Sequence, residues 1–200
     1  MKKLLLTAAV ICTGSSAMAG ALEFVPAPLP PMPAPVLQAW TGPYVGAQAG
    51  VGNADLITNG TPAVSLSGPV YGLHAGYLHD FGTLVIGAEV DYNLADISGE
   101  FDGEAVITDL AHLKARVGAD LGQVLLYGTG GYAYTTIELF NGSSVYEGQG
   151  LFYGVGAEYL INANWSAGAE YLVHQFEDVG GAGFLDIDLT TIQARVSYHF

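Results

Sequence analysis

Strict alternation of apolar and polar residues is the feature that most constrains this chain. In the segment LVIGAEVDYNL, which begins at Leu84, every second residue is leucine, isoleucine, alanine, valine or tyrosine. A period of two places successive side chains on opposite faces of a β-strand. After Val85, the other phase carries Gly87, Glu89, Asp91 and Asn93. This segment therefore predicts a strand whose two faces meet different surroundings.

The same alternation recurs from residue 40 to the end of the chain, and we predict an all-β fold with eight strands. They cover roughly residues 40–51, 69–81, 83–97, 109–121, 123–139, 150–162, 164–177 and 187–200. Tight connections at 81–83, 121–123 and 162–164 alternate with longer ones at 52–68, 98–108, 140–149 and 178–186. Short and long connections thus fall at opposite ends of a meander. This layout is that of an eight-stranded antiparallel up-and-down β-barrel.

The composition of the polar phase indicates which face of the barrel is wet. A soluble barrel should crowd its outer face with Lys, Glu, Ser and Thr, whereas here the polar phase is sparse and rich in glycine. Glycine is a poor residue for a solvent-facing strand, but it leaves room in a narrow interior. We assign to this phase Gly72, Gly76, Gly118, Gly128, Gly130, Gly154, Gly156 and Gly168. We therefore expect the polar phase to point inward and the apolar phase to face lipid.

The apolar phase also holds most of the strand tyrosines. Several lie near strand ends, where an amphipathic ring suits the membrane interface. The set is Tyr71, Tyr77, Phe81, Tyr92, Tyr127, Tyr153, Tyr159, Trp165, Tyr171, Tyr198 and Phe200. The alternative is that these rings form the core of a soluble barrel.

The phasing has exceptions. His79 and Gln175 fall outside, which suits positions near the interfaces, while three leucines fall inside. These leucines are Leu78, Leu160 and Leu172. A bulge around Gly130 and Gly131 could move Tyr132 and Tyr134 from one face to the other.

The charged residues predict a feature of the interior. Every basic residue beyond the first twenty lies in the polar phase, among acidic residues of the same phase. The interior of an eight-stranded barrel is too narrow for bulk water, so buried charges there must be paired. The predicted ion-pair network consists of Glu89, Asp91, Lys114, Arg116, Glu158, Glu170 and Arg195. Four histidines share the phase and could add donors, namely His74, His112, His174 and His199.

The first residues predict export. Lys2 and Lys3 precede a short apolar run, and Ala17-Met18-Ala19 resembles a signal-peptidase site. We divide the chain into a signal peptide at 1–19, a proline-rich periplasmic linker at 20–38 and a barrel domain at 39–200. The apolar run is shorter than the roughly 20 residues of a membrane-spanning helix. The single cysteine, Cys12, lies in the signal segment, so no disulfide is expected.

The charge excludes a nucleic-acid partner. The sequence contains 19 acidic and 5 basic residues, and two of the basic residues lie in the predicted signal peptide. Phosphate binding needs clustered positive charge.

The chain contains a proline-rich lead, a WTGPYVG opening at 40–46, a GGYAY stretch at 130–134 and an aromatic C-terminus. Together these motifs resemble the small porin-like outer-membrane proteins of the opacity and outer-membrane immunogenic protein family. The resemblance implies a barrel in the outer membrane of a Gram-negative cell, with periplasmic termini, surface loops and insertion by the barrel-assembly machinery. Val196, Tyr198 and Phe200 are similar to the assembly signal of such barrels, although Phe200 could equally be an interfacial residue.

We expect an integral outer-membrane barrel with a structural, envelope-integrity and surface-interaction role, and with outer-membrane lipid and lipopolysaccharide as partners. Acidic residues at 100, 102, 104, 147, 178 and 186 are assigned to loops, where they are either solvated or joined to lipopolysaccharide by divalent cations. The alternative function is a narrow channel for small solutes. No catalytic residue, cofactor or metal site is predicted, because Ser166, Ser197 and the four histidines point away from lipid. The histidines could hold a metal only if their heights in the barrel coincide.

Overall fold

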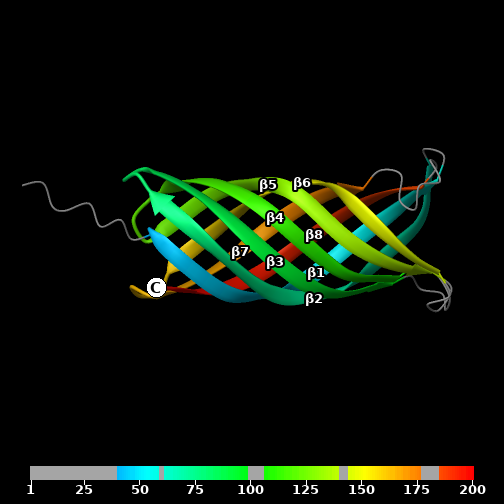
Figure 1. Cartoon of the computed structure of the whole chain (residues 1–200), viewed down its shortest axis with the longest axis horizontal. Helices are drawn as coiled ribbons and strands as arrows, with labels where there is room; N and C mark the ends of the chain where they lie inside the picture. Colours follow the sequence, from blue (N-terminus) through cyan, green and yellow to red (C-terminus); the bar gives the residue numbers. More distant parts are fainter. Residues whose placement is uncertain (1–39, 59–60, 99–105, 140–143, 177–184) are drawn as a thin grey trace, which may run out of the picture. The chain divides into compact units, whose positions relative to one another are not determined.

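Eight antiparallel strands close into a barrel in which each strand pairs with its sequence neighbours and β1 pairs with β8 (Figure 1). The computed structural model describes residues 40–58, 61–98, 106–139, 144–176 and 185–200. The strands are β1 (Gly42–Thr58), β2 (Thr61–Asp80), β3 (Leu84–Ser98), β4 (Val106–Asp120), β5 (Val124–Leu139), β6 (Ser144–Leu160), β7 (Trp165–Phe176) and β8 (Leu185–His199). The predicted fold class and strand number are confirmed. Among these residues no helix is long and apolar enough to cross a membrane.

The three tight connections and the C-terminus lie at one end of the barrel, at the left of Figure 1. In each turn a side chain accepts a backbone hydrogen bond from two residues ahead: Asp80 from Gly82, Asp120 from Gly122, and Asn162 from Asn164. Both glycines have positive φ, 100° and 86°, a conformation that costs glycine little. The repeated Asp-x-Gly sequence therefore fixes two of the three turns.

In the half of the barrel near the tight turns, the two faces are assigned as predicted. Val90 is 53% exposed on the outer surface, whereas Glu89 beside it is 1% exposed. Leucine, isoleucine and valine, with Trp165 and Tyr171 on β7, cover the outside of the barrel at this level. The exceptions in this half also agree, because Leu78 and Leu160 are buried and His79 is exposed. We call this part the membrane half.

In the other half the polarity of the two faces is reversed. Asn53, Asp55 and Asp96 are exposed, while inward side chains at this level are apolar. The inward set is Ala54, Leu66, Val70, Ile97, Ile107, Leu110, Ala133, Ile137, Phe152, Leu172, Phe176, Ile187 and Leu189. This pattern, with polar residues outside and apolar residues inside, is that of a barrel standing in water. We call this part the surface half.

The surface half corrects the predicted lengths of the strands. Residues 52–58 and 61–68, expected as part of a long connection, belong to the paired strands β1 and β2. The prediction was wrong because it looked for the polarity of the membrane half, which does not apply above the membrane. For the same reason Glu147 and Asp186, expected in loops, lie in β6 and β8.

Strand β5 corrects the assignment of one tyrosine and two glycines. Tyr127 is buried inside the barrel, and Gly128 and Gly130 lie in the outward phase. The register of β5 runs without a shift through Gly130 and Gly131, so Tyr132 and Tyr134 face outward without a bulge at those glycines. Tyr127 turns inward because its hydroxyl has a carboxylate partner there, described below.

The predicted signal peptide at 1–19 and linker at 20–38 lie outside the described residues. So do the acidic positions 100, 102, 104 and 178.

Candidate functional site

The seven residues of the predicted network are brought together inside the membrane half, from β3, β4, β6, β7 and β8. Each is at most 6% exposed. Three of the longest side chains stand directly across from glycine on the neighbouring strand: Arg116 from Gly87, Arg195 from Gly168, and Glu170 from Gly156. Glycine thus leaves the space that a large charged side chain fills.

Arg195 links three carboxylates. It pairs with Glu89, with Glu170 at 2.8 Å and with Glu158 at 3.4 Å. Arg116 pairs with Glu158 and, at 3.2 Å, with Glu89. The two guanidiniums therefore share Glu89 and Glu158, and the four side chains form one connected group.

Lys114 extends this group toward the surface half. Its Nζ lies 2.6 Å from Glu170, 2.8 Å from Asp91 and 3.2 Å from Glu89. Removing a charge from water costs several kcal/mol, which only close partners offset. All four carboxylates have a basic partner, so the network meets this condition.

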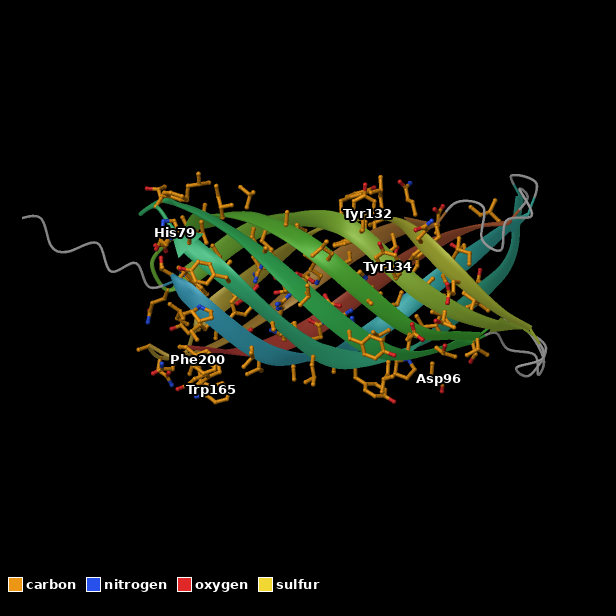
Figure 2. The ribbon with its side chains drawn as sticks, viewed as in Figure 1. His79, Asp96, Tyr132, Tyr134, Trp165 and Phe200 are labelled. Atoms are coloured by element: carbon orange, nitrogen blue, oxygen red, sulfur yellow. The ribbon has the colours of Figure 1, made fainter. Side chains whose placement is uncertain are left out.

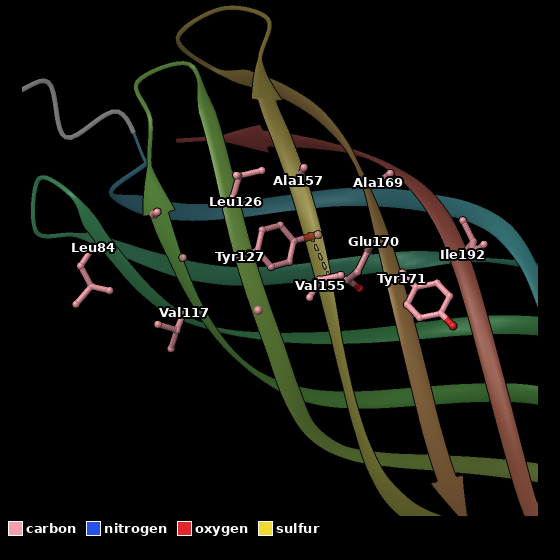
Figure 3. A pocket seen from close by; sticks show the side chains of 14 residues that line it. Leu84, Val117, Leu126, Tyr127, Val155, Ala157, Ala169, Glu170, Tyr171 and Ile192 are labelled. Carbon is pink, nitrogen blue, oxygen red and sulfur yellow. Dashed lines mark hydrogen bonds between the residues drawn. The ribbon is translucent and has the colours of Figure 1, made fainter.

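Two tyrosines that the sequence analysis did not assign to the network complete it. Tyr44 donates a hydrogen bond to Glu89 at 2.6 Å and accepts one from Arg116 at 2.8 Å. Tyr127 donates to Glu170 at 3.0 Å, and its ring lies 3.8 Å from the Arg116 guanidinium carbon. Figure 3 shows Tyr127 and Glu170 meeting behind the wall of the barrel. Tyr44 shares a strand phase with Gly46 and Gln48, which is the signal that could have identified it.

The four inward histidines do not meet at one point. His112 and His174 contact each other, whereas His74 pairs with Ser197 at 2.8 Å and His199 with Ser166 at 3.0 Å. Within the described ranges, no cluster of three or more His, Cys, Asp or Glu is arranged to hold a metal ion.

Apolar layers lie on both sides of the network. Toward the tight turns the interior holds an apolar cluster of Trp40, Tyr44, Leu78, Val85, Leu125, Tyr127 and Leu160, against which the buried and hydrogen-bonded His199 and Ser166 also lie. Trp40 Nε1 donates to the carbonyl of Gly122 at 3.2 Å, which fixes this large side chain at the turn end. On the other side, the inward residues of the surface half fill the barrel and form what we call the upper apolar layer. The charged side chains therefore form a middle layer, which we call the ionic layer, between two apolar layers.

Aromatic residues mark two levels on the outer face (Figure 2). Trp165, Tyr198 and Phe200 lie at the tight-turn end. The ring centroid of Tyr198 lies 5.2 Å from that of Trp165 and 5.0 Å from that of Phe200. Tyr132 and Tyr134 project outward nearer the other end. Tyr71 in β2 and Phe81, in the turn directly after β2, are both exposed and ten residues apart, and about ten residues of a strand tilted by about 40° span about 25 Å. This height equals that of the apolar band of an outer-membrane barrel.

The residues of the predicted assembly signal lie on this outer face. Val196 and Phe200 are exposed and Tyr198 is half-buried against its aromatic neighbours. His79 is also exposed at the tight-turn end, where its ring packs 4.5 Å from that of Phe81.

A shallow groove crosses the outer wall between these levels (Figure 3). Its lining includes the small outward residues Ala119, Gly128, Ala157 and Ala169 and larger ones such as Val155 and Tyr171. The groove belongs to the lipid-facing surface.

Comparison with known proteins places this barrel in a family. Residues 7–200 match the outer membrane protein beta-barrel domain family. The 31 kDa outer-membrane immunogenic protein of Brucella melitensis is 29% identical over 234 residues, covering 100% of this chain and 96% of the relative. The 25 kDa outer-membrane immunogenic protein of Brucella canis is 30% identical, covering 86% of each chain. These relatives are named as antigens and not as enzymes.

Two solved structures show the same fold. Neisserial surface protein A aligns with a TM-score of 0.56 and 18% identity, covering 80% of this chain and 98% of its own. Ail, the attachment invasion locus protein of Yersinia pestis, aligns with a TM-score of 0.51 and 14% identity, covering 80% and 99%. The closed barrel, its apolar outer belt and the family match agree, and the chain belongs to the outer membrane protein beta-barrel domain family and is a protein of the outer membrane.

Proposed function

We propose that this protein is a structural barrel of the cell envelope that presents its surface half to the outside and does not conduct solutes. The observation that carries the proposal is the three-layer interior, with the ionic layer between two apolar layers. An eight-stranded barrel is just wide enough for its side chains to fill it. An ion crossing the interior would have to displace Phe152 and Leu172 on one side and Trp40 on the other, and break charge pairs between them.

The polar outer face of the surface half supports a surface-interaction role. Its exposed acidic residues include Asp55, Asp96 and Asp188, and no Lys or Arg is exposed in the described ranges. The relatives are named immunogenic proteins, and one structural neighbour is named an attachment invasion locus protein. Accessibility of this half to other molecules outside the cell is consistent with those names.

The proposed lipid partners follow from the two outer faces. The apolar belt of the membrane half would contact acyl chains, and the acidic rim above it would lie at the level of lipopolysaccharide head groups. Because the rim is acidic, contact with lipopolysaccharide phosphates would need divalent cations between them. The barrel-assembly machinery is the proposed partner during insertion.

We propose no catalysis. Ser166 is buried and lies between Glu158 at 3.1 Å and His199 at 3.0 Å, inside the layer next to the tight turns. A lipid substrate on the outer face would be separated from this serine by the barrel wall.

Conductance of the purified, refolded protein in planar bilayers tests the closed interior. We expect no conductance steps, and a large general porin measured in the same bilayers provides the positive control. A compact, heat-modifiable band in gel electrophoresis would show that the sample is folded. Steady conductance of the wild-type barrel would contradict the proposal and support the alternative of a narrow channel.

A matched pair of variants locates the barrier. Phe152→Ala removes an inward ring of the upper apolar layer, whereas Tyr153→Ala removes an outward ring beside it. If the upper apolar layer blocks the passage of ions, conductance should increase in Phe152→Ala and not in Tyr153→Ala. Equal leak in both variants would point to disturbance of the bilayer around the protein.

A further inference from the structure

A line of hydrogen bonds connects the ionic layer to the upper apolar layer. His112 Nδ1 lies 2.6 Å from Asp91 Oδ1, and His112 Nε2 lies 2.9 Å from His174 Nε2. His174 Nδ1 lies 3.1 Å from the backbone carbonyl oxygen of Leu189. All three side chains are buried.

The two ends of this line can only accept hydrogen bonds. The carbonyl of Leu189 has no proton to give. Asp91 is an ionised carboxylate in this setting, because Lys114 lies 2.8 Å from its Oδ2 and Asn93 Nδ2 donates to its Oδ1. Both outer nitrogens of the histidine pair, His112 Nδ1 and His174 Nδ1, must therefore carry hydrogen.

The contact in the middle then requires one more proton. A neutral imidazole carries hydrogen on only one nitrogen, so two neutral rings would leave two lone pairs facing each other across 2.9 Å. Three hydrogen bonds need three N–H groups, and two neutral rings supply two. A bridging metal does not fit either, since two nitrogens bound tetrahedrally to Zn²⁺ at about 2.0–2.1 Å would lie about 3.4 Å apart.

The charge of the ionic layer requires the same proton. Its carboxylates are Glu89, Asp91, Glu158 and Glu170, and its bases are Lys114, Arg116 and Arg195. Four negative and three positive charges leave one negative charge uncompensated, which is costly inside a barrel. One proton on the histidine pair makes the layer neutral.

Neighbouring groups decide which ring holds the proton. The pair contacts Asp91 on β3 and, on β6, the ring of Phe152 at 4.9 Å, and Lys114 on β4 pairs with Asp91. Glu89, Glu170 and Arg195 are connected to the pair only through Lys114 and its partners, and His74 on β2 is bonded to Ser197. His112 touches a carboxylate and His174 touches a neutral carbonyl. The positive charge is therefore more stable on His112.

We propose that His112 and His174 form a binding site for one proton, with His112 an imidazolium at neutral pH that donates to both Asp91 and His174. The site completes the charge balance of the ionic layer and joins it to the upper apolar layer. This role does not depend on whether the barrel conducts.

Nitrogen NMR of the folded protein tests this proposal directly. The full chain is labelled with ¹⁵N-histidine, refolded in detergent micelles and measured at pH 7. We expect hydrogen on both ring nitrogens of His112 and on Nδ1 alone of His174. Two neutral rings, or a proton shared with Asp91 so that His112 carries hydrogen on Nε2 only, would overturn the proposal.

Asp91→Asn provides the second test. This variant leaves three acidic and three basic residues in the layer, so the extra proton is no longer needed for neutrality. We expect His112 to become neutral at pH 7, whereas His79→Gln, which changes an exposed histidine, should leave the His112 signals unchanged. An imidazolium that persists in folded Asp91→Asn would contradict the charge argument, and if that variant does not fold, the wild-type spectrum still decides.

Discussion

The two halves of this barrel use the same strands with opposite polarity. In the membrane half the outside is apolar and the inside holds ion pairs, whereas in the surface half the outside is polar and the inside holds leucine, isoleucine and phenylalanine. A single strand crosses both regimes: β3 has Val90 outside and Glu89 inside, and then Asp96 outside and Ile97 inside. Which of the two phases of a strand is apolar therefore depends on whether lipid or water surrounds the barrel at that level.

Loss of a basic residue of the ionic layer should have the largest effect on stability. Arg116→Met leaves Glu158 and Glu89 with fewer partners inside the barrel. Breaking a buried pair costs about 3–5 kcal/mol, and urea unfolding in lipid vesicles, followed by tryptophan fluorescence, measures it. Combining Arg116→Met with Glu158→Gln should cost less than the sum of the two changes. Additive losses would show that the two side chains do not interact.

Truncation of a core residue in the surface half tests whether this half has a true apolar interior. Leu66→Ala should cost about 2–5 kcal/mol, because Leu66 is buried in the upper layer. Ser67→Ala, at the adjacent exposed position, should change stability by less than about 0.5 kcal/mol. Similar losses for both variants in the same unfolding assay would contradict the reversed polarity.

A charged residue introduced on the outer face should destabilise the barrel in the membrane half but not in the surface half. Val90→Arg places arginine on the lipid-facing belt, where the cost is about 2–4 kcal/mol near the midplane. Ser67→Arg makes the same kind of change outside the surface half and should cost less than about 0.5 kcal/mol. The comparison fails if Ser67→Arg is as destabilising as Val90→Arg.

Loss of the terminal ring should have the smallest effect on the stability of the folded barrel. Phe200 is exposed and contacts Tyr198 at the tight-turn end. Phe200→Ala should cost less than about 1 kcal/mol by unfolding but should lower the amount of folded protein in the outer membrane of cells. If Phe200→Ala reaches the outer membrane in full amount, Phe200 acts only as an interfacial residue. Tyr77→Ala, which removes another exposed ring, is the matched control for loss of an interfacial ring.

The sequence predicts the fold and the ionic layer to the extent that one phase of a strand is clearly more polar than the other. In β3 and β4 the charged phase is unmistakable, and Glu89, Asp91, Lys114 and Arg116 lie where the alternation places them. In β5 both phases contain tyrosine and glycine, so the alternation cannot show that Tyr127 faces inward. Only the position of Glu170 and Arg116 around its ring does so.

The contacts between strands that are distant in the sequence could not be predicted. Alternation gives the face of a residue but not its height in the barrel, which depends on strand register. His112 and His174 meet because their strands bring them to one level, whereas His74 and His199 lie elsewhere with serine partners. The length of the surface half was missed for a related reason, since its polarity reverses above the membrane.

Spin-label accessibility at Val90 and Ser67 tests the central claim most directly. Cys12 is the only cysteine of the sequence, so single cysteines can be introduced at these two outward positions in a Cys12→Ser background and labelled in lipid vesicles. We predict that a label at 90 is reached by oxygen dissolved in the bilayer and not by a water-soluble nickel complex, and that a label at 67 is reached by the nickel complex. Nickel access at 90, or lipid-like access at both positions, would contradict the assignment of the two halves.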